Sequence, residues 1–162
     1  GRRPKKRPDI RKWEVFYMDL EKRVSMLETA YAGVQADAVR CFDNMGVLER
    51  ITEQKKREQL ALGRVQAERF GVKKAQDVFE KLSEVFNCAK WIIEKEEDGF
   101  VAESKACRLC AIAKQMSKAS PCRIYCLNPM EGMVKGINPD NTFEVEETLW
   151  DGLKCRIRIE EK

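Results

Sequence analysis

The C-terminal stretch Thr142–Glu160, TFEVEETLWDGLKCRIRIE, alternates apolar and polar side chains on both sides of a short turn. The dipeptide Asp151-Gly152 between the two runs is a typical hairpin turn. The face expected to be buried carries Phe143, Val145, Glu147, Leu149, Leu153, Cys155, Ile157 and Ile159. A period of two with one apolar face predicts an antiparallel hairpin whose covered side needs helices.

A second hairpin is predicted earlier in the chain. Residues 91–95 form the first strand, Glu97-Asp98-Gly99 form the turn, and residues 100–106 form the returning strand. Between the two hairpins lies a cysteine-rich segment of helical composition, which starts at Cys107. The sheet is therefore expected to consist of two hairpins joined by a helical insert.

Three amphipathic helices are predicted upstream, at about residues 9–46, 47–70 and 72–90. In the first helix, apolar residues recur at intervals of three and four, which predicts one buried face. These residues are Val24, Leu27, Tyr31, Val34, Ala38 and Cys41. The expected fold class is α+β, with N-terminal amphipathic helices packed on an antiparallel sheet made of two hairpins, and with a Cys-rich helical insert.

Charge is unevenly distributed along the 162 residues. Residues 1–12 carry a net charge of +6, and the whole chain carries +4, so the remainder is slightly acidic. We predict a disordered basic arm at 1–9 and a single α+β domain at 10–162, helical over 10–90, with the sheet and insert over 91–162. The acidic body argues against nucleic-acid binding, and no apolar run is long enough for a membrane span. A cytoplasmic location is the expectation.

Four of the seven cysteines lie close together in the sequence, and the chain has no histidine. They are Cys107, Cys110, Cys122 and Cys126. Two close thiol pairs favour a tetrahedral thiolate site, with zinc as the expected ion. An iron–sulfur cluster, a redox pair and a disulfide are the alternatives. Arg108 and Arg123 lie inside the pairs and would favour the thiolate forms.

The remaining cysteines and aromatic residues have weaker predicted roles. Cys155 is on the apolar face of its strand, so it is either a core residue or a further ligand of the same site. Cys41 and Cys88 are expected to be core residues. A ligand pocket between helices and sheet could be lined by Trp91, Phe100, Phe143 and Trp150, each of which could equally be plain core.

Several short motifs lie in the C-terminal half. They are Cys-Leu-Asn-Pro-Met at 126–130, Gly-Ile-Asn-Pro at 136–139, Glu-Thr-Leu-Trp at 147–150, and Gly-x-x-Cys-x-Ile-x-Ile at 152–159. This half resembles the 4-vinyl-reductase-type small-molecule-binding domains and their relatives, the aminothiazoline-carboxylate hydrolase-like proteins. The resemblance implies helices packed on an antiparallel sheet, with Cys122, Cys126 and Cys155 at metal-binding or ligand-facing positions. Its enzyme-named relatives imply ring-opening hydrolysis of a small sulfur heterocycle.

Three functions are compatible with these observations. The first is a small-molecule-binding or sensor-type domain with a thiolate zinc site, which the sequence alone favours over an enzyme. The second is a metal-assisted hydrolase of a small sulfur heterocycle, with Glu147 or Glu131 as general base. A bulge at Glu146-Glu147 would instead turn both carboxylates outward. The third is an iron–sulfur or redox thiol protein, and the long helices make a homodimer plausible. The sequence does not identify the ligand.

Overall fold

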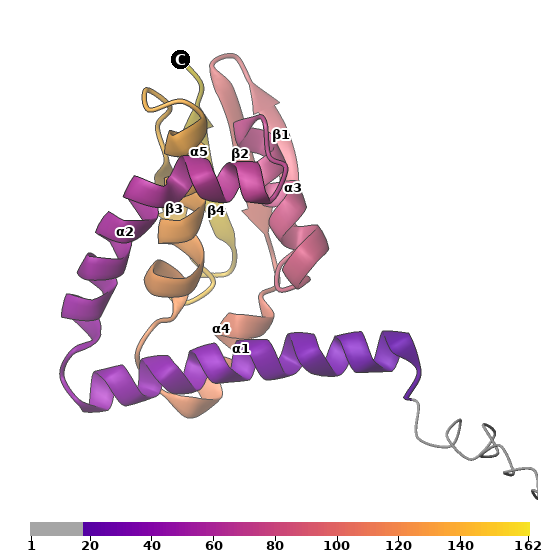
Figure 1. Ribbon diagram of the computed structural model, residues 1–162, viewed down its shortest axis with the longest axis vertical. Helices are drawn as coiled ribbons and strands as arrows, with labels where there is room; N and C mark the ends of the chain where they lie inside the picture. Colours follow the sequence, from indigo (N-terminus) through magenta and orange to yellow (C-terminus); the bar gives the residue numbers. More distant parts are fainter. Residues whose placement is uncertain (1–17) are drawn as a thin grey trace, which may run out of the picture.

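The structure is a computed structural model that describes residues 18–162 (Figure 1). Its elements are α1 (Leu20–Asn44), α2 (Leu48–Arg69), α3 (Ala75–Phe86), β1 (Ile92–Glu96), β2 (Gly99–Ser104), α4 (Arg108–Met116), the π-helical turn η2 (Arg123–Leu127), α5 (Asn128–Ile137), β3 (Glu144–Glu147) and β4 (Cys155–Glu160). Helices packed on an antiparallel sheet confirm the predicted α+β class. The predicted basic arm and the start of the first predicted helix lie outside the described residues.

The four strands form one antiparallel sheet in the order β1-β2-β4-β3. The two predicted hairpins therefore meet along β2 and β4, where Phe100 is opposite Ile159 and Ser104 is opposite Cys155. A bulge between Val145 and Glu147 interrupts the pairing of β3 with β4. The sequence allowed either a regular strand with Glu147 on the buried face or a bulge at Glu146-Glu147, and the structure has the bulge.

Helices α3 and α5 cover the buried face of the sheet, and α2 crosses the outer side of α5 (Figure 1). Phe79 of α3 is fully buried and anchors this arrangement. Its ring is edge-on to Trp91 at 5.3 Å and to Phe100 at 5.6 Å, and it is stacked on Phe143 at 6.5 Å. Edge-on and offset aromatic contacts of this kind stabilise a core beyond the area they bury.

Glycines bring the backbones of α2 and α5 into direct contact. A Cβ atom at Gly63 of α2 would lie 1.8 Å from the carbonyl oxygen of Gly132 in α5. A Cβ atom at Gly132 would lie 2.5 Å from the carbonyl oxygen of Gln59, and one at Gly136 would lie 2.3 Å from the amide nitrogen of Arg64. No other residue type fits at these crossing points, so the glycines set the distance between the two helices.

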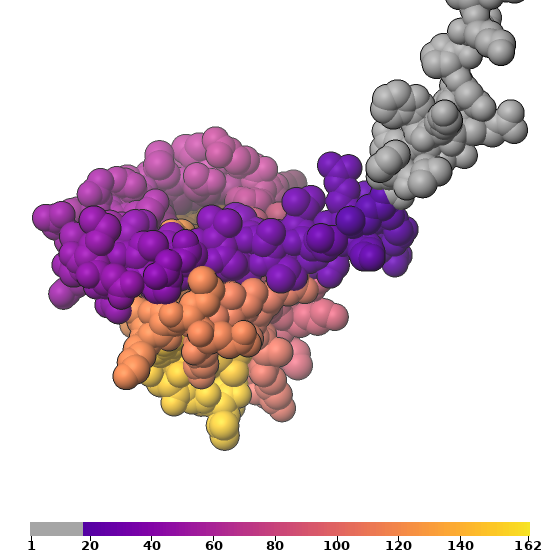
Figure 2. Space-filling model, turned by 90° about the horizontal axis from the view of Figure 1, so that it is seen from below, coloured from indigo at the N-terminus to yellow at the C-terminus, as the bar shows by residue number. Residues whose placement is uncertain are grey.

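Helix α1 lies apart from the other helices and is held mainly by α4 (Figures 1 and 2). Ala32 and Ala36 are buried against Leu109 and Ala113 of α4, because small side chains allow close helix packing. In Figure 2 the N-terminal end of α1 (indigo) extends past the rest of the described molecule.

The face of α1 that periodicity predicts to be buried is largely exposed, so this expectation is wrong for the described chain. Val34 is 69% exposed, Leu27 is 60% exposed and Tyr31 is 50% exposed. The alanine-rich face takes the contact with α4, because α4 is the element that lies against α1. The larger apolar side chains Leu27, Tyr31 and Val34 lie outside this contact and remain exposed.

We predict that Gly63→Ala destabilises the fold by about 1–3 kcal/mol, because the added methyl group must push α2 away from α5. The matched control is Gly33→Ala in the middle of α1, where no atom lies within 4 Å of the added Cβ. This control should stabilise the protein by about 0.5–1 kcal/mol, since alanine is the better helix former. Urea unfolding followed by circular dichroism measures both. Equal effects of the two substitutions would contradict close packing of α2 and α5.

Candidate functional site

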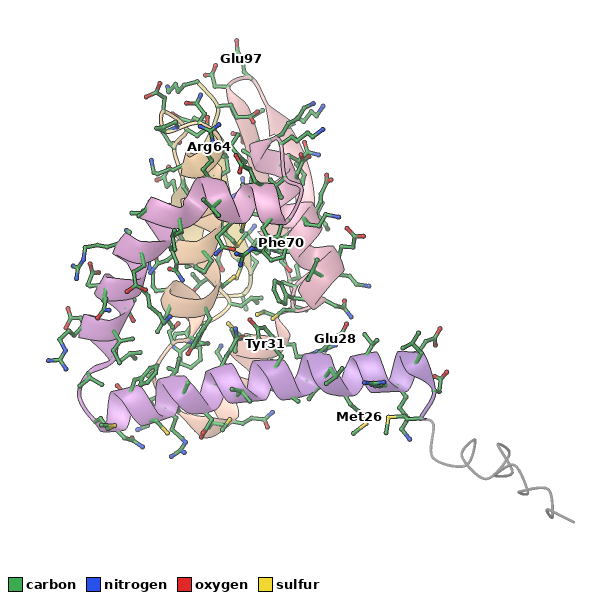
Figure 3. All side chains as sticks on the ribbon, viewed as in Figure 1. Met26, Glu28, Tyr31, Arg64, Phe70 and Glu97 are labelled. Atoms are coloured by element: carbon green, nitrogen blue, oxygen red, sulfur yellow. The ribbon has the colours of Figure 1, made fainter. Side chains whose placement is uncertain are left out.

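A cavity of about 350 Å³ lies between α1, α2, α3 and the η2–α5 segment. Its walls are mostly apolar, and its aromatic side chains are Tyr31, Phe70, Phe86, Trp91 and Tyr125. Tyr31 stacks on Phe86 at 5.4 Å, so these two rings join α1 to α3 at one side of the cavity. Figure 3 shows Tyr31 and Glu28 projecting from α1 toward the rest of the molecule, whereas Met26 projects away from it.

A few polar groups lie around this apolar cavity. Glu28 accepts hydrogen bonds from Arg108 at 2.9 Å and from Asn87 at 3.2 Å. The hydrogen bond from Arg108 lowers the pKa of Glu28. Gln59 donates to the carbonyl oxygen of Ile124 at 3.3 Å, but its own side-chain oxygen is buried with no hydrogen-bond partner. This oxygen exposes almost no surface, so a ligand in the cavity would reach it only after the Gln59 side chain turned.

Three cysteines, Cys88, Cys107 and Cys126, also line the cavity. The first two come together because the β1–β2 hairpin continues past its strands, with an isolated antiparallel bridge between Ala89 and Cys107. The Cys88 and Cys107 sulfur atoms are 3.7 Å apart, and the backbone N–H of Leu109 donates to the Cys88 sulfur at 3.3 Å. Cys88, which we expected to be a core residue, is thus a half-buried neighbour of Cys107 at the cavity.

Cys107 occupies the N-cap position of α4, and its sulfur accepts a hydrogen bond from the backbone N–H of Cys110 at 3.5 Å. The pKa of Cys107 is lowered by hydrogen bonds from the Cys110 and Cys88 thiols, with further help from backbone N–H groups. A helix N-terminus also favours negative charge. Of the thiols at the cavity wall, Cys107 is the one whose surroundings favour the thiolate.

A further sulfur contact lies behind Cys107. The Cys110 and Cys122 sulfur atoms are 3.4 Å apart in the buried interior. The hydrogen bonds that Cys110 makes to Cys107 and to Cys122 raise the pKa of Cys110, whereas its bond to Cys122 lowers the pKa of Cys122. A thiol has one proton, so Cys110 donates to one of these two neighbours at a time.

The last cysteines of the predicted set are in less favourable surroundings for a thiolate. Burial raises the pKa of Cys126, whose sulfur lies 3.6 Å from that of Met130. Burial also raises the pKa of Cys155 to about 11, although the backbone N–H of Leu149 donates to its sulfur at 3.3 Å. Both cysteines are expected to remain protonated at neutral pH.

Among residues 18–162, no group of three or more Cys, Asp or Glu side chains is arranged to hold a metal ion. Cys88 and Cys107 instead form one sulfur–sulfur contact, and Cys110 and Cys122 form another. As placed, these thiols do not fit a shared ion, and we derive no chemical step through one. The predicted zinc and iron–sulfur sites stay predictions.

Only one of the four aromatic residues predicted for the ligand pocket lines the cavity. Of the four aromatic residues, Trp91 lines the cavity, Phe100 and Phe143 belong to the core around Phe79, and Trp150 lies under the Lys114 ammonium at 5.7 Å.

Neither predicted carboxylate is among the residues that line the cavity. Glu147 accepts hydrogen bonds from the backbone N–H groups of Leu153 at 2.7 Å and Lys154 at 3.3 Å, so it holds the β3–β4 loop. Glu131 pairs with Lys56 at 3.5 Å. The proposal that either residue acts as a general base stays a prediction.

The family model for L-2-amino-thiazoline-4-carboxylic acid hydrolase matches residues 17–159. The chain therefore belongs to this family, which confirms the aminothiazoline part of the resemblance, while the 4-vinyl-reductase part stays a prediction. No curated protein and no solved structure gives a significant match. No helix within residues 18–162 has the length and apolar character needed to cross a membrane.

We predict that Cys107 reacts with iodoacetamide faster than Cys155 at pH 7. The lowered pKa of Cys107 means that it is already a thiolate there, so its rate should change little up to pH 9. The raised pKa of Cys155 means that its rate should increase about tenfold per pH unit over the same range. Peptide mass spectrometry of timed, quenched samples measures both rates. A Cys107 rate that climbs as steeply as that of Cys155 would contradict the assignment.

Proposed function

We propose that the protein is a hydrolase that opens a small sulfur-containing ring, of the 2-amino-thiazoline-4-carboxylate type, in the cavity next to Cys107. The observation that carries the proposal is the position of Cys107, at the N-terminus of α4 and on the cavity wall. Family membership supports the reaction class. The sequence alone favoured a binding or sensor domain. The position of Cys107 and the family membership together favour an enzyme.

The cavity suits a small, flat and partly polar molecule. About 350 Å³ is at the lower end of the range for ligand pockets, and the aromatic walls provide flat surfaces for a ring. Lys55 lines the cavity, and Arg108 is held next to the cavity by its ion pair with Glu28, which is also a lining residue. These two cations are the candidate partners for a substrate carboxylate. A turn of the Gln59 side chain, whose oxygen now has no hydrogen-bond partner, would let it accept a hydrogen bond from the exocyclic amino group.

The proposed reaction uses a thiolate and one water molecule. The Cys107 sulfur adds to the carbon between the ring sulfur and the ring nitrogen, and the bond from this carbon to the ring sulfur breaks. The released ring sulfur takes a proton from solvent and becomes a thiol, and the hydrolysis step that follows returns one proton to solvent. Water then adds to the same carbon, and the bond to Cys107 breaks. The products are a urea that carries the opened thiol arm and a regenerated Cys107 thiolate, so atoms and charges balance.

We predict that the protein hydrolyses 2-amino-thiazoline-4-carboxylate and that Cys107→Ser lowers kcat by about 10²-fold or more, because a serine hydroxyl is a much weaker nucleophile at neutral pH. The released thiol is measured with a chromogenic disulfide added to timed samples after the protein has been removed. The matched control is Cys41→Ser, since Cys41 is on α1 and is not among the cavity-lining residues. Full activity of a folded Cys107→Ser protein would contradict a nucleophilic role for this residue.

A thiolate metal site is the second candidate, with either a sensor role or metal-assisted hydrolysis. Its support is the 3.4 Å separation of the Cys110 and Cys122 sulfur atoms. Two thiolates on one zinc ion are about 3.8 Å apart, given Zn–S bonds of about 2.3 Å. A small rearrangement that turned Cys107 or Cys126 toward this pair would be needed to complete the site.

Elemental analysis of the protein as purified tests this second candidate. A zinc site predicts close to one zinc per chain, which Cys122→Ser would remove, whereas an iron–sulfur cluster predicts a brown protein that contains iron. Cys41→Ser is again the control and should leave the metal content unchanged. A metal content far below one per chain would eliminate this candidate and leave the thiol mechanism.

A further inference from the structure

An apolar stripe runs along the full length of α1, and it is largely exposed apart from the contact that the Tyr31 ring makes with Phe86 of α3. We define this seam as Leu20, Val24, Leu27, Tyr31, Val34 and Ala38. All but Ala38 are large apolar side chains with substantial exposure, and Ala38 is half-buried. The buried contact of α1 with α4 uses different residues, Ala32 and Ala36, so the seam is not part of that contact.

The spacing within the seam is four, three, four, three and four residues. This is the seven-residue repeat of a coiled coil, in which two positions per heptad face a partner helix. A helix that packs on a globular core usually shows a broader apolar stripe than this. Cys41, three residues after Ala38, continues the repeat over the whole of the 25-residue helix.

The N-terminal third of α1 has little packing against the rest of the described chain. Every residue from Leu20 to Leu27 is exposed, so no side chain in this part of the helix is buried in the described chain. Short helical segments without tertiary contacts are marginal in water, because most helix stability in proteins comes from packing of an apolar face. The segment nevertheless places three large apolar residues of the seam in register with those that follow.

We propose that the seam pairs with the same seam of a second copy of this chain, in an antiparallel arrangement. In the register that places Leu27 against Tyr31 of the second copy, Val24 meets Val34 and Leu20 meets Ala38. The exposed N-terminal third of each helix then lies on the C-terminal half of the other. Every seam residue gains an apolar partner, and the two-fold symmetry closes the assembly as a dimer.

The charges beside the seam fit this register. Arg23 would lie next to Asp37 of the second copy, and symmetry repeats this attraction at the other end. Asp37 also pairs within its own chain with Arg40 at 2.6 Å, and this exposed pair leaves room for a second cation. The Glu28 side chains of the two copies approach near the symmetry axis, but each is held by the Arg108 guanidinium of its own chain.

Tyr31 belongs to both the seam and the cavity wall. Pairing would therefore bring a Leu27 side chain of the second copy to one edge of the cavity. The dimer itself does not depend on the proposed hydrolase activity, because it rests on the seam and its flanking charges.

The first test is the mass of the full chain in solution, measured by light scattering after gel filtration at micromolar concentration. We expect twice the 18.8 kDa chain mass for the wild type and a monomer for Val34→Glu, because a carboxylate would be buried without a partner. The control is Met26→Glu, since Met26 is also exposed, at 54%, but lies off the seam and projects to the other side of α1 (Figure 3). This variant should remain a dimer. A monomeric wild type would overturn the proposal, as would dissociation by Met26→Glu and not by Val34→Glu.

The second test fixes the direction of pairing. In a Cys41→Ser background, Val24→Cys chains are mixed with Val34→Cys chains and oxidised. The antiparallel register predicts a disulfide between the two different chains. Disulfides that join two Val24→Cys chains, or two Val34→Cys chains, would overturn the antiparallel register.

Discussion

The structure depends on the close approach of α2 and α5, in which glycine backbones touch without side chains between them. This contact places Gln59, Leu62 and Gln66 of α2 above Pro129, Met130 and Met133 of α5, and these six residues form one side of the cavity. Because α5 also packs on the sheet, the depth of the cavity is fixed relative to the strands. The helix spacing therefore determines the size of molecule that can reach Cys107.

The second constraint is the β1–β2 hairpin, whose two chains stay together beyond the strands and, after a one-residue shift in register, form the bridge between Ala89 and Cys107. It brings Cys88 to the sulfur of Cys107 exactly where α4 begins, so a neighbouring thiol and a helix N-terminus act on the same atom. Each effect favours negative charge on Cys107. A residue with this environment on the wall of a mostly apolar cavity is a candidate nucleophile in a chain of a hydrolase family.

Much of the fold could be predicted from the sequence, because the strands have a period of two, the first hairpin has an Asp-Gly turn, and the first two helices end near glycines. The tight turn predicted at Asp151-Gly152 is wrong, because β3 ends at Glu147 and β4 begins at Cys155, and Leu153 in this longer loop is 90% exposed and not buried. The site was harder to predict. Spacing alone grouped Cys107 with Cys110, but Cys88 was missed, although extending the hairpin register from Asp98-Gly99 would have placed it opposite Cys107. Phe100 and Phe143 were candidates for the pocket, but both pack against Phe79 in the core. The presence of an aromatic residue in the sequence does not distinguish a pocket position from a core position. The seam of α1 was expected to be buried, and one chain alone does not bury it.

The central claim is that the cavity presents a Cys107 thiolate to a small sulfur heterocycle. The most direct measurement is rapid quenching of the wild-type protein during turnover of 2-amino-thiazoline-4-carboxylate, followed by mass spectrometry of its cysteine-containing peptides. The account predicts a transient mass increase equal to the whole substrate, located on the peptide that contains Cys107. Steady turnover with no adduct on Cys107, or with the adduct on another cysteine, would contradict it.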